Sequence, residues 1–222
     1  MVDPKLAAWS ISRLSTFEQC PYKFYLYNIT KQVKDFGNEA TEWGKTVHKA
    51  LELRLKDNKP LPKSMHEYEP WVRPIENAQG QLYTEQQLAL NRDLQPCTWF
   101  DRNTYVRSIL DIARINQHVA WVGDWKTGSM KYANDDQLKL FAVMIFQQHP
   151  SVSVVKTNYL WLKEGHVTGN VYERHEADDI WAELLPRDNR IEQAVETNVW
   201  QAKPSRLCDW CSAKKQGICT HG

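Results

Sequence analysis

Residues 107–128, RSILDIARINQHVAWVGDWKTG, contain two apolar segments that are separated by the polar pair Gln117 and His118. Apolar and β-branched residues dominate both segments, and a Thr-Gly pair ends the second one. The pattern therefore predicts a β-hairpin with strands over residues 105–115 and 119–126.

The register of this hairpin brings two acidic side chains together. A two-residue turn pairs Asn116 with Val119, which places Asp111 opposite Asp124 with Cβ atoms roughly 5 Å apart. Two carboxylates at that distance repel by about 3 kcal/mol at an effective dielectric constant of 20, whereas a divalent cation between them reverses the sign. Strand alternation puts Lys126 on the same face. The hairpin therefore predicts a metal site, with a salt-bridged strand end as the plain structural alternative.

The composition bounds the class of protein. The chain has 222 residues, a formal net charge of +1, 42% hydrophobic residues and 25% charged residues, which is typical of a globular protein. So small a net charge means that any DNA site must be a local basic patch. The start of the chain has no apolar signal core and no apolar run approaches membrane-spanning length, so we expect a cytoplasmic protein with one domain over residues 1–222.

The hydrophobic pattern elsewhere predicts an α+β protein. We expect helices that begin at Ser15 and that cover residues 38–58, 134–149 and 177–199, the last one broken, kinked or restarted at Pro186. We expect further strands over residues 82–90, 98–100, 152–162 and 166–174, and an exposed connection from Pro60 to Pro74. This order of elements is typical of a mixed central sheet flanked by helices.

Three more side chains are candidates for the site. His48 lies in the middle of the second helix, one turn after Gly44, although a histidine there is more often a core residue. Glu85 lies on an upstream strand, where an exposed glutamate is an equally good interpretation. Gln137 opens the helix after the hairpin and could orient a water or a phosphate, with a solvated helix-start residue as the simpler alternative.

The ordered set of these residues resembles the RecB-type branch of the PD-(D/E)XK nucleases. The matching segments, in chain order, are LSTFEQCPYKFYLY, GKTVH, Glu85, SILD, DWK at 124–126 and QLKLF at 137–141. The resemblance covers the chain from about Ser10 to Cys219. Ser108 stands where the family usually has glycine, and Phe141 stands where it usually has tyrosine, so position 141 offers no hydroxyl.

The resemblance implies a restriction-endonuclease-like fold and a set of metal ligands. His48, Asp111, Asp124 and the backbone carbonyl of Trp125 would bind Mg²⁺ or Mn²⁺, the cations that suit oxygen ligands with one imidazole. Such an ion stabilises charge on a scissile phosphate.

The resemblance also implies roles for the remaining site residues. Lys126 would position or deprotonate the attacking water or stabilise the charged phosphate. Glu85 would reach a second ion or its water, and Gln137 would place water or phosphate. The implied activity is cleavage of DNA, first of all as an exonuclease on single strands or ends in recombination, repair or phage DNA processing. The alternative is a non-cleaving DNA-binding accessory domain or a subunit of a larger nuclease complex.

Three of the five cysteines lie close together near the C-terminus. Cys208, Cys211 and Cys219 form a C-x₂-C-x₇-C pattern, and Cys20 is available as a fourth ligand for a [4Fe–4S] cluster or a zinc ion. Unligated thiols are the plain alternative. This distribution resembles the iron-sulfur subset of the RecB-type nucleases, which includes the AddB nuclease domain and the nucleases of CRISPR adaptation. The implied cluster would join the two ends of the chain, and Cys97 is expected to be a core thiol.

Basic and aromatic residues surround the C-terminal cysteines. They are Lys203, Arg206, Lys214 and Lys215, which lie near Trp200 and Trp210 in the sequence. This mixture suits single-stranded DNA, through phosphate contacts and base stacking, and a solvated basic tail is an equally good interpretation.

Overall fold

The computed structural model describes residues 8–34, 37–132 and 134–221. The chain divides into two compact units, one made of Met1–Gly37 and Ala182–Gly222 and the other of Asn38–Trp181. The organisation as a single domain stays a prediction. In the described part of the chain, no helix has the length and apolar character that crossing a membrane requires.

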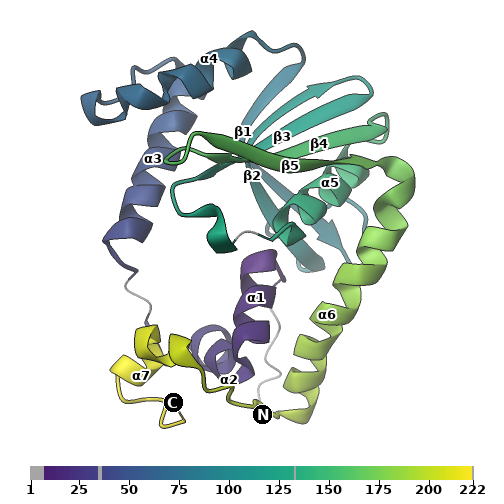
Figure 1. Ribbon diagram of the computed structural model, residues 1–222. Helices are drawn as coiled ribbons and strands as arrows, with labels where there is room; N and C mark the ends of the chain where they lie inside the picture. Colours follow the sequence, from purple (N-terminus) through teal and green to yellow (C-terminus); the bar gives the residue numbers. More distant parts are fainter. Residues whose placement is uncertain (1–7, 35–36, 133, 222) are drawn as a thin grey trace. The chain divides into compact units, whose positions relative to one another are not determined.

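The larger unit is built on a mixed sheet with the strand order β1-β2-β3-β4-β5. The strands are β1 (Gln81–Asn91), β2 (Thr104–Asn116), β3 (Val119–Lys126), β4 (Val154–Trp161) and β5 (His166–Glu173). Neighbouring strands are antiparallel except β3 and β4, which are parallel and are connected through helix α5 (Asp136–Gln148). A parallel pair needs such a crossover. Figure 1 shows this sheet with α5 packed beside it, so the expected α+β class with a mixed, helix-flanked sheet is confirmed.

The hairpin between β2 and β3 has the predicted register. Asn116 pairs with Val119, and the pairing continues as far as Ile112 and Gly123. Gln117, the first residue of the turn, has a φ of 35°, as a tight two-residue connection requires.

Helix α3 (Glu39–Asp57) covers one face of the sheet. Its N-terminus is capped by Asn38, whose side chain accepts a hydrogen bond from the backbone of Thr41 at 2.9 Å. The buried stripe consists of Val47, Leu51 and Leu55, which pack in one core with Ile112, Trp125 and Leu160 of the sheet. Trp43, one turn before Val47, is 42% exposed and lies outside this stripe.

The segment from Pro60 to Pro74 is not an exposed connection. It forms a 3₁₀ helix (Lys63–Tyr68) followed by α4 (Glu69–Asn77). Pro70, at the start of α4, interrupts no hydrogen bond, because the first amide groups have no partner within the helix. Pro74 lies inside α4 and removes one helical donor, which the helix tolerates because its apolar side chains are buried. The core under α3 is completed by side chains from residues 61–75: Leu61, Met65, Tyr68, Val72 and Ile75.

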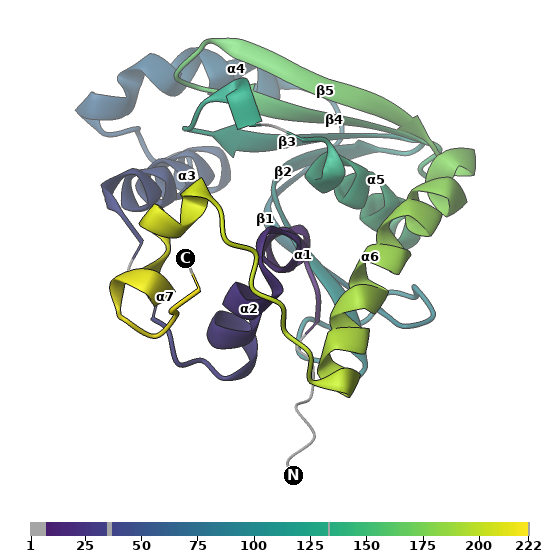
Figure 2. The ribbon, with the colours of Figure 1, turned by 60° about the horizontal axis from the view of Figure 1, so that its bottom comes forward.

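The smaller unit is made of elements from both ends of the chain. They are α1 (Ile11–Gln19), α2 (Pro21–Phe24), a π-helical turn (Tyr25–Ile29), the part of α6 (Ala177–Thr197) from Ala182 onward, a 3₁₀ helix (Arg206–Trp210) and α7 (Ser212–Lys215). Figure 2 shows α1, α2 and α7 from a second side. Helix α1 begins at Ile11 after the N-cap Ser10, not at Ser15 as predicted, and α6 continues through Pro186.

Side chains from the two chain ends share the core of this unit. Leu14, Phe17 and Phe24 pack with Ile191 and Ala194 of α6. At the surface of the same unit, the guanidinium of Arg187 donates two hydrogen bonds to the carboxylate of Glu18, at 2.9 and 2.8 Å. Burial and a bidentate ion pair therefore connect segments that are far apart in the sequence.

Candidate active site

Three acidic residues lie at the same level of the sheet on adjacent strands: Glu85 on β1, Asp111 on β2 and Asp124 on β3. We call these three residues the acidic row. Glu85 of β1 is level with Asp111 of β2, and their pairing is skipped in the β1–β2 ladder. The β2–β3 ladder ends one residue before Asp111 and Asp124. Glu85 also has a φ of 48°, which costs a non-glycine residue on the order of 1–3 kcal/mol. The sheet is therefore interrupted where the acidic side chains meet.

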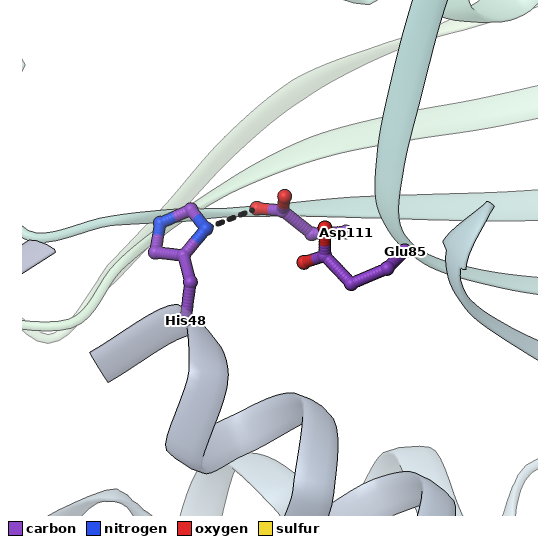
Figure 3. A group of neighbouring side chains, drawn as sticks. All are labelled: His48, Glu85 and Asp111. Carbon is purple, nitrogen blue, oxygen red and sulfur yellow. Dashed lines mark ion pairs between the residues drawn. The ribbon is translucent and has the colours of Figure 1, made fainter. Parts of the chain in front are cut away.

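His48 reaches this acidic row from helix α3, as Figure 3 shows. Its Nδ1 lies 3.2 Å from Oδ2 of Asp111, and the same oxygen accepts a hydrogen bond from the backbone N–H of Trp125 at 2.8 Å. One ligand atom from each of His48, Glu85 and Asp111 lies within 4.8 Å of the other two. This arrangement is small enough for one divalent cation to contact all three side chains.

Gly44 allows α3 to approach the site, as the sequence indicated. A Cβ atom at this position would lie 3.1 Å from Oγ1 of Thr127, which directly follows Lys126. A Cβ atom would press on this hydroxyl, so the absence of a side chain gives the His48 turn room beside the end of β3.

Asp124 is the most buried of the three acids, with 3% of its surface exposed. Burial, followed by the charge of Asp111, raises the pKa of Asp124 to about 7, although Lys126 and His48 act in the opposite direction. Its Oδ2 lies 2.6 Å from Nζ of Lys126 but has no partner in hydrogen-bonding geometry. A buried carboxylate oxygen of this kind, beside a second carboxylate, fits a divalent cation, whose charge offsets both burial and repulsion.

The pKa values of the other two ligand candidates, His48 and Glu85, are also raised. Burial lowers the pKa of His48, but the hydrogen bond and charge of Asp111 outweigh it and leave the pKa raised. Burial, and then the charge of Asp111, raise the pKa of Glu85. The negative charge of Asp111 contributes to both raised pKa values, and a bound cation would offset that charge.

Gln137, at the start of α5, forms hydrogen bonds with both Lys126 and Asp124. Its Oε1 accepts a hydrogen bond from Nζ of Lys126 at 3.0 Å, and its Nε2 donates to Oδ1 of Asp124 at 2.8 Å. The side chain at the start of α5 therefore fixes the separation of the carboxylate and the ammonium. Phe141, one turn later, is fully buried in the core.

Tyr159 is a site residue that the sequence did not indicate. It pairs with Asp124 across the parallel β3–β4 ladder, and Nζ of Lys126 lies 4.7 Å from the centre of its ring. Burial, followed by the charge of Asp124, raises the pKa of Tyr159, and its hydroxyl donates to the carbonyl of Asn134 at 2.9 Å. The ring thus holds the ammonium group through a cation–π contact.

The two faces of the sheet meet at these carboxylates. Trp125 points into the core beneath α3, whereas Asp124 points toward α5. Because the β2–β3 ladder stops at this level, His48 from one face and Gln137 from the other reach the same acidic row.

Four cysteines line one pocket of the smaller unit. They are Cys20, Cys208, Cys211 and Cys219. The sulfur of Cys20 accepts hydrogen bonds from the backbone N–H groups of Lys23 and Lys203, both at 3.4 Å, and the sulfur of Cys208 accepts one from Ser205 at 3.3 Å. Such donors stabilise thiolates and cluster-bound sulfur.

The remaining cysteine lies in the larger unit. Cys97 is half-buried rather than a core thiol, and its sulfur lies 3.7 Å from Oγ1 of Thr104. It follows β1 in the connection to β2, so it is separate in sequence and in unit from the four-cysteine pocket.

The two C-terminal tryptophans have different environments. Trp200 packs between Phe24 and Tyr25, with ring centres 6.1 and 5.1 Å away, so it belongs to the core of the smaller unit. Trp210 is 77% exposed, and Nζ of Lys215 lies 5.6 Å from the centre of its ring. Only the second ring has the exposure that base stacking requires.

Comparison with known proteins agrees with this geometry. A model of the PD-(D/E)XK nuclease superfamily matches residues 8–219, so the chain belongs to this superfamily. A solved structure from Eubacterium rectale, whose description proposes an exonuclease, is 13% identical, with coverage of 93% of this chain and 87% of that chain and a TM-score of 0.52. The structure of SSO0001 is 14% identical, with coverage of 93% and 84% and a TM-score of 0.46. Comparison with curated protein sequences gave no match.

Proposed function

We propose that this protein is a divalent-metal-dependent deoxyribonuclease that acts as an exonuclease on single-stranded DNA or DNA ends in the cytoplasm. The observation that carries the proposal is the convergence of His48, Glu85 and Asp111 within 4.8 Å, together with the Asp124–Lys126 pair, whose carboxylate feels the charge of Asp111. The exonuclease description of the Eubacterium rectale structure favours action at ends. Recombination, repair and phage DNA processing are the pathways in which such an enzyme would act.

The ligand set is suited to a hard cation. His48, Asp111, Asp124 and the carbonyl of Trp125 would hold Mg²⁺ or Mn²⁺. The geometric observation that supports this fit is the buried Oδ2 of Asp124, which lies 2.6 Å from Nζ of Lys126 but has no partner in hydrogen-bonding geometry. When bound, the ion supplies positive charge for the scissile phosphate. Glu85, on the other side of Asp111, would hold a second ion or orient water.

Lys126 and Gln137 act on the attacking water and the phosphate. The ammonium of Lys126 lies at the mouth of the site, with 29% of its side chain exposed, and can orient the water or neutralise charge on the phosphate. Gln137 and the ring of Tyr159 hold this ammonium in place. A positioned group loses less entropy when the transition state forms.

The experiment that tests the function uses end-labelled linear single strands, the same sequence as a closed circle, and a duplex. We expect Mn²⁺ or Mg²⁺ to support degradation of the linear strand, excess chelator to stop it, and the circle to survive. Cleavage of the circle would show that the protein acts as an endonuclease and not as an exonuclease. Binding of DNA without cleavage at any metal concentration would overturn the proposed enzymatic activity. The protein would then be an accessory DNA-binding domain or a subunit of a larger complex.

For the four-cysteine pocket we propose a [4Fe–4S] cluster, with zinc as the alternative. The N–H donors on the sulfurs of Cys20 and Cys208 support a ligated state. The lining of one pocket by all four cysteines supports a shared centre that joins Cys20 to the C-terminal cysteines.

Loss of this centre should destabilise the whole smaller unit. We expect Cys20→Ala and Cys208→Ala to lose metal together and to lower the melting temperature by roughly 10 °C or more, since a shared centre closes the loop between chain ends. Cys97→Ala is the matched control and should change neither property. The measurements are iron, sulfide and zinc assays after anaerobic purification, with thermal melts. A full metal load in Cys20→Ala would confine the site to the C-terminal cysteines.

A further inference from the structure

The connection between β1 and β2 presents an exposed aromatic ring beside arginines. Phe100 is 86% exposed. The guanidinium of Arg107 lies 5.1 Å from the centre of the Trp99 ring and 6.0 Å from that of Phe100, and the guanidinium of Arg92 lies 4.8 Å from the Tyr105 ring. We call these five residues the aromatic–arginine loop. The prediction of a strand over residues 98–100 is wrong, because this segment leads into a turn of the loop.

Hydrogen bonds hold this loop in one shape. The side-chain oxygen of Asn91 accepts the backbone N–H of Gln95 at 2.9 Å, and Oγ1 of Thr104 contacts the carbonyls of Thr98 and Asp101 at 3.1 and 2.9 Å. Phe100 is therefore exposed on an ordered support. An aromatic ring that is already held in place loses little conformational entropy when it binds a partner.

Strand β2 connects the loop directly to the acidic row. Its residues 106–110 pair regularly with β1, so Arg107 and Ile109 share one face of the strand, and Asp111 follows where the ladder is interrupted. Ile109, between the other two, is 39% exposed. The four steps from Arg107 to Asp111 span about 13 Å. A polymer strand that reaches Asp111 along this face also passes Arg107 and the rings beside it.

The chemistry of the loop selects an unpaired, negatively charged polymer. Arg92, Arg102 and Arg107 outnumber Asp93 and Asp101 in and beside the loop. Guanidinium groups bind phosphate through paired hydrogen bonds, and exposed aromatic rings stack on bases regardless of sequence. In a duplex the faces of the bases are already stacked on one another, so only a single strand offers them.

We propose that the aromatic–arginine loop binds the single-stranded part of the substrate, with Phe100 stacked on an unpaired base and Arg107 beside a phosphate. This inference rests on the proposed DNA cleavage and adds to it a base-binding position away from the metal ligands. It also explains why a large apolar ring is held in solvent next to cations.

The test measures binding of labelled oligonucleotides by fluorescence anisotropy, with Lys126→Ala as the parent so that the DNA persists. We expect Phe100→Ala to bind single strands roughly tenfold more weakly, the size that stacking of one base contributes. Phe100→Trp should keep the affinity and Phe100→Leu should lose it, because stacking needs a ring. Val171→Ala, which removes a side chain 58% exposed on β5, is the matched control and should bind like the parent. Binding of a blunt duplex should not change.

An abasic nucleotide placed at successive positions of the single strand locates the contact. At one position it should weaken binding by the parent tenfold and leave Phe100→Ala unaffected. Equal affinity of Phe100→Ala and the parent for normal single strands would overturn the inference. This holds even if light scattering shows that the substitution changes the oligomeric state. Failure of the parent and the wild-type protein to bind any DNA would overturn the proposed function itself.

Discussion

Asp111→Asn should abolish metal-supported DNA cleavage while the protein stays folded. The asparagine oxygen can still accept the hydrogen bond that the backbone of Trp125 donates at 2.8 Å, so the local structure persists. The substitution removes the negative charge that lies between His48, Glu85 and Asp124, and with it the attraction for a divalent cation. Cleavage of end-labelled single strands in Mn²⁺ measures the loss, which we expect to exceed 10³-fold.

Thermal melts separate the metal from the fold in this variant. For the wild-type protein, Mn²⁺ at about 100 times its dissociation constant should raise the melting temperature by roughly 5–10 °C, because it binds the folded state alone. In Asp111→Asn this increase should vanish. In chelator, the variant should melt no earlier than the wild type, because the charge of Asp111 is one cause of the raised pKa of Asp124.

Asp178→Asn is the matched control for this experiment, since Asp178 is an exposed acid in the first turn of α6. It should keep both the activity and the Mn²⁺-dependent increase of the melting temperature. Undiminished cleavage by Asp111→Asn would remove this carboxylate from the site and reduce the acidic row to a structural feature.

Lys126→Ala should lower turnover by roughly 10²–10⁴, the range for a positioned proton-transfer group. The ammonium lies 2.6 Å from Asp124 and is held by Gln137, so the substitution removes a positioned positive charge beside the carboxylates. Affinity for Mn²⁺ should change little, because lysine is not a ligand. Single-turnover rates at saturating metal, together with a calorimetric Mn²⁺ titration, separate the two properties.

Lys156→Ala, at an exposed position of β4, is the matched control and should leave turnover unchanged. Turnover of Lys126→Ala close to that of the wild type would show that Lys126 serves only as a salt-bridge partner of Asp124. A loss of Mn²⁺ binding equal to the loss of turnover would instead indicate that the variant disturbs the ligands.

Local sequence was sufficient for the hairpin. A two-residue turn determines which residues pair, and the alternation of a strand determines which share a face, so Asp111, Asp124 and Lys126 could be placed without any tertiary information. The position of His48 on α3, one turn after Gly44, made it a candidate for the site, although a histidine there is more often a core residue. Proline content, in contrast, was misleading for α4. Pro70 is tolerated near the start of the helix, and the burial of Val72 and Ile75 outweighs the effect of Pro74 in its interior.

The remaining features depended on contacts between segments that no local pattern links. The long connection between β1 and β2 leaves their register open in the sequence, so the position of Glu85 beside Asp111 came only from the folded sheet. Tyr159 reaches Lys126 through a parallel pairing, whose register the crossover helix does not specify. The sequence by itself determined the acid pair and the lysine, because turn length and strand period are local. Only tertiary packing decided what surrounds them, because burial and strand order depend on the whole chain.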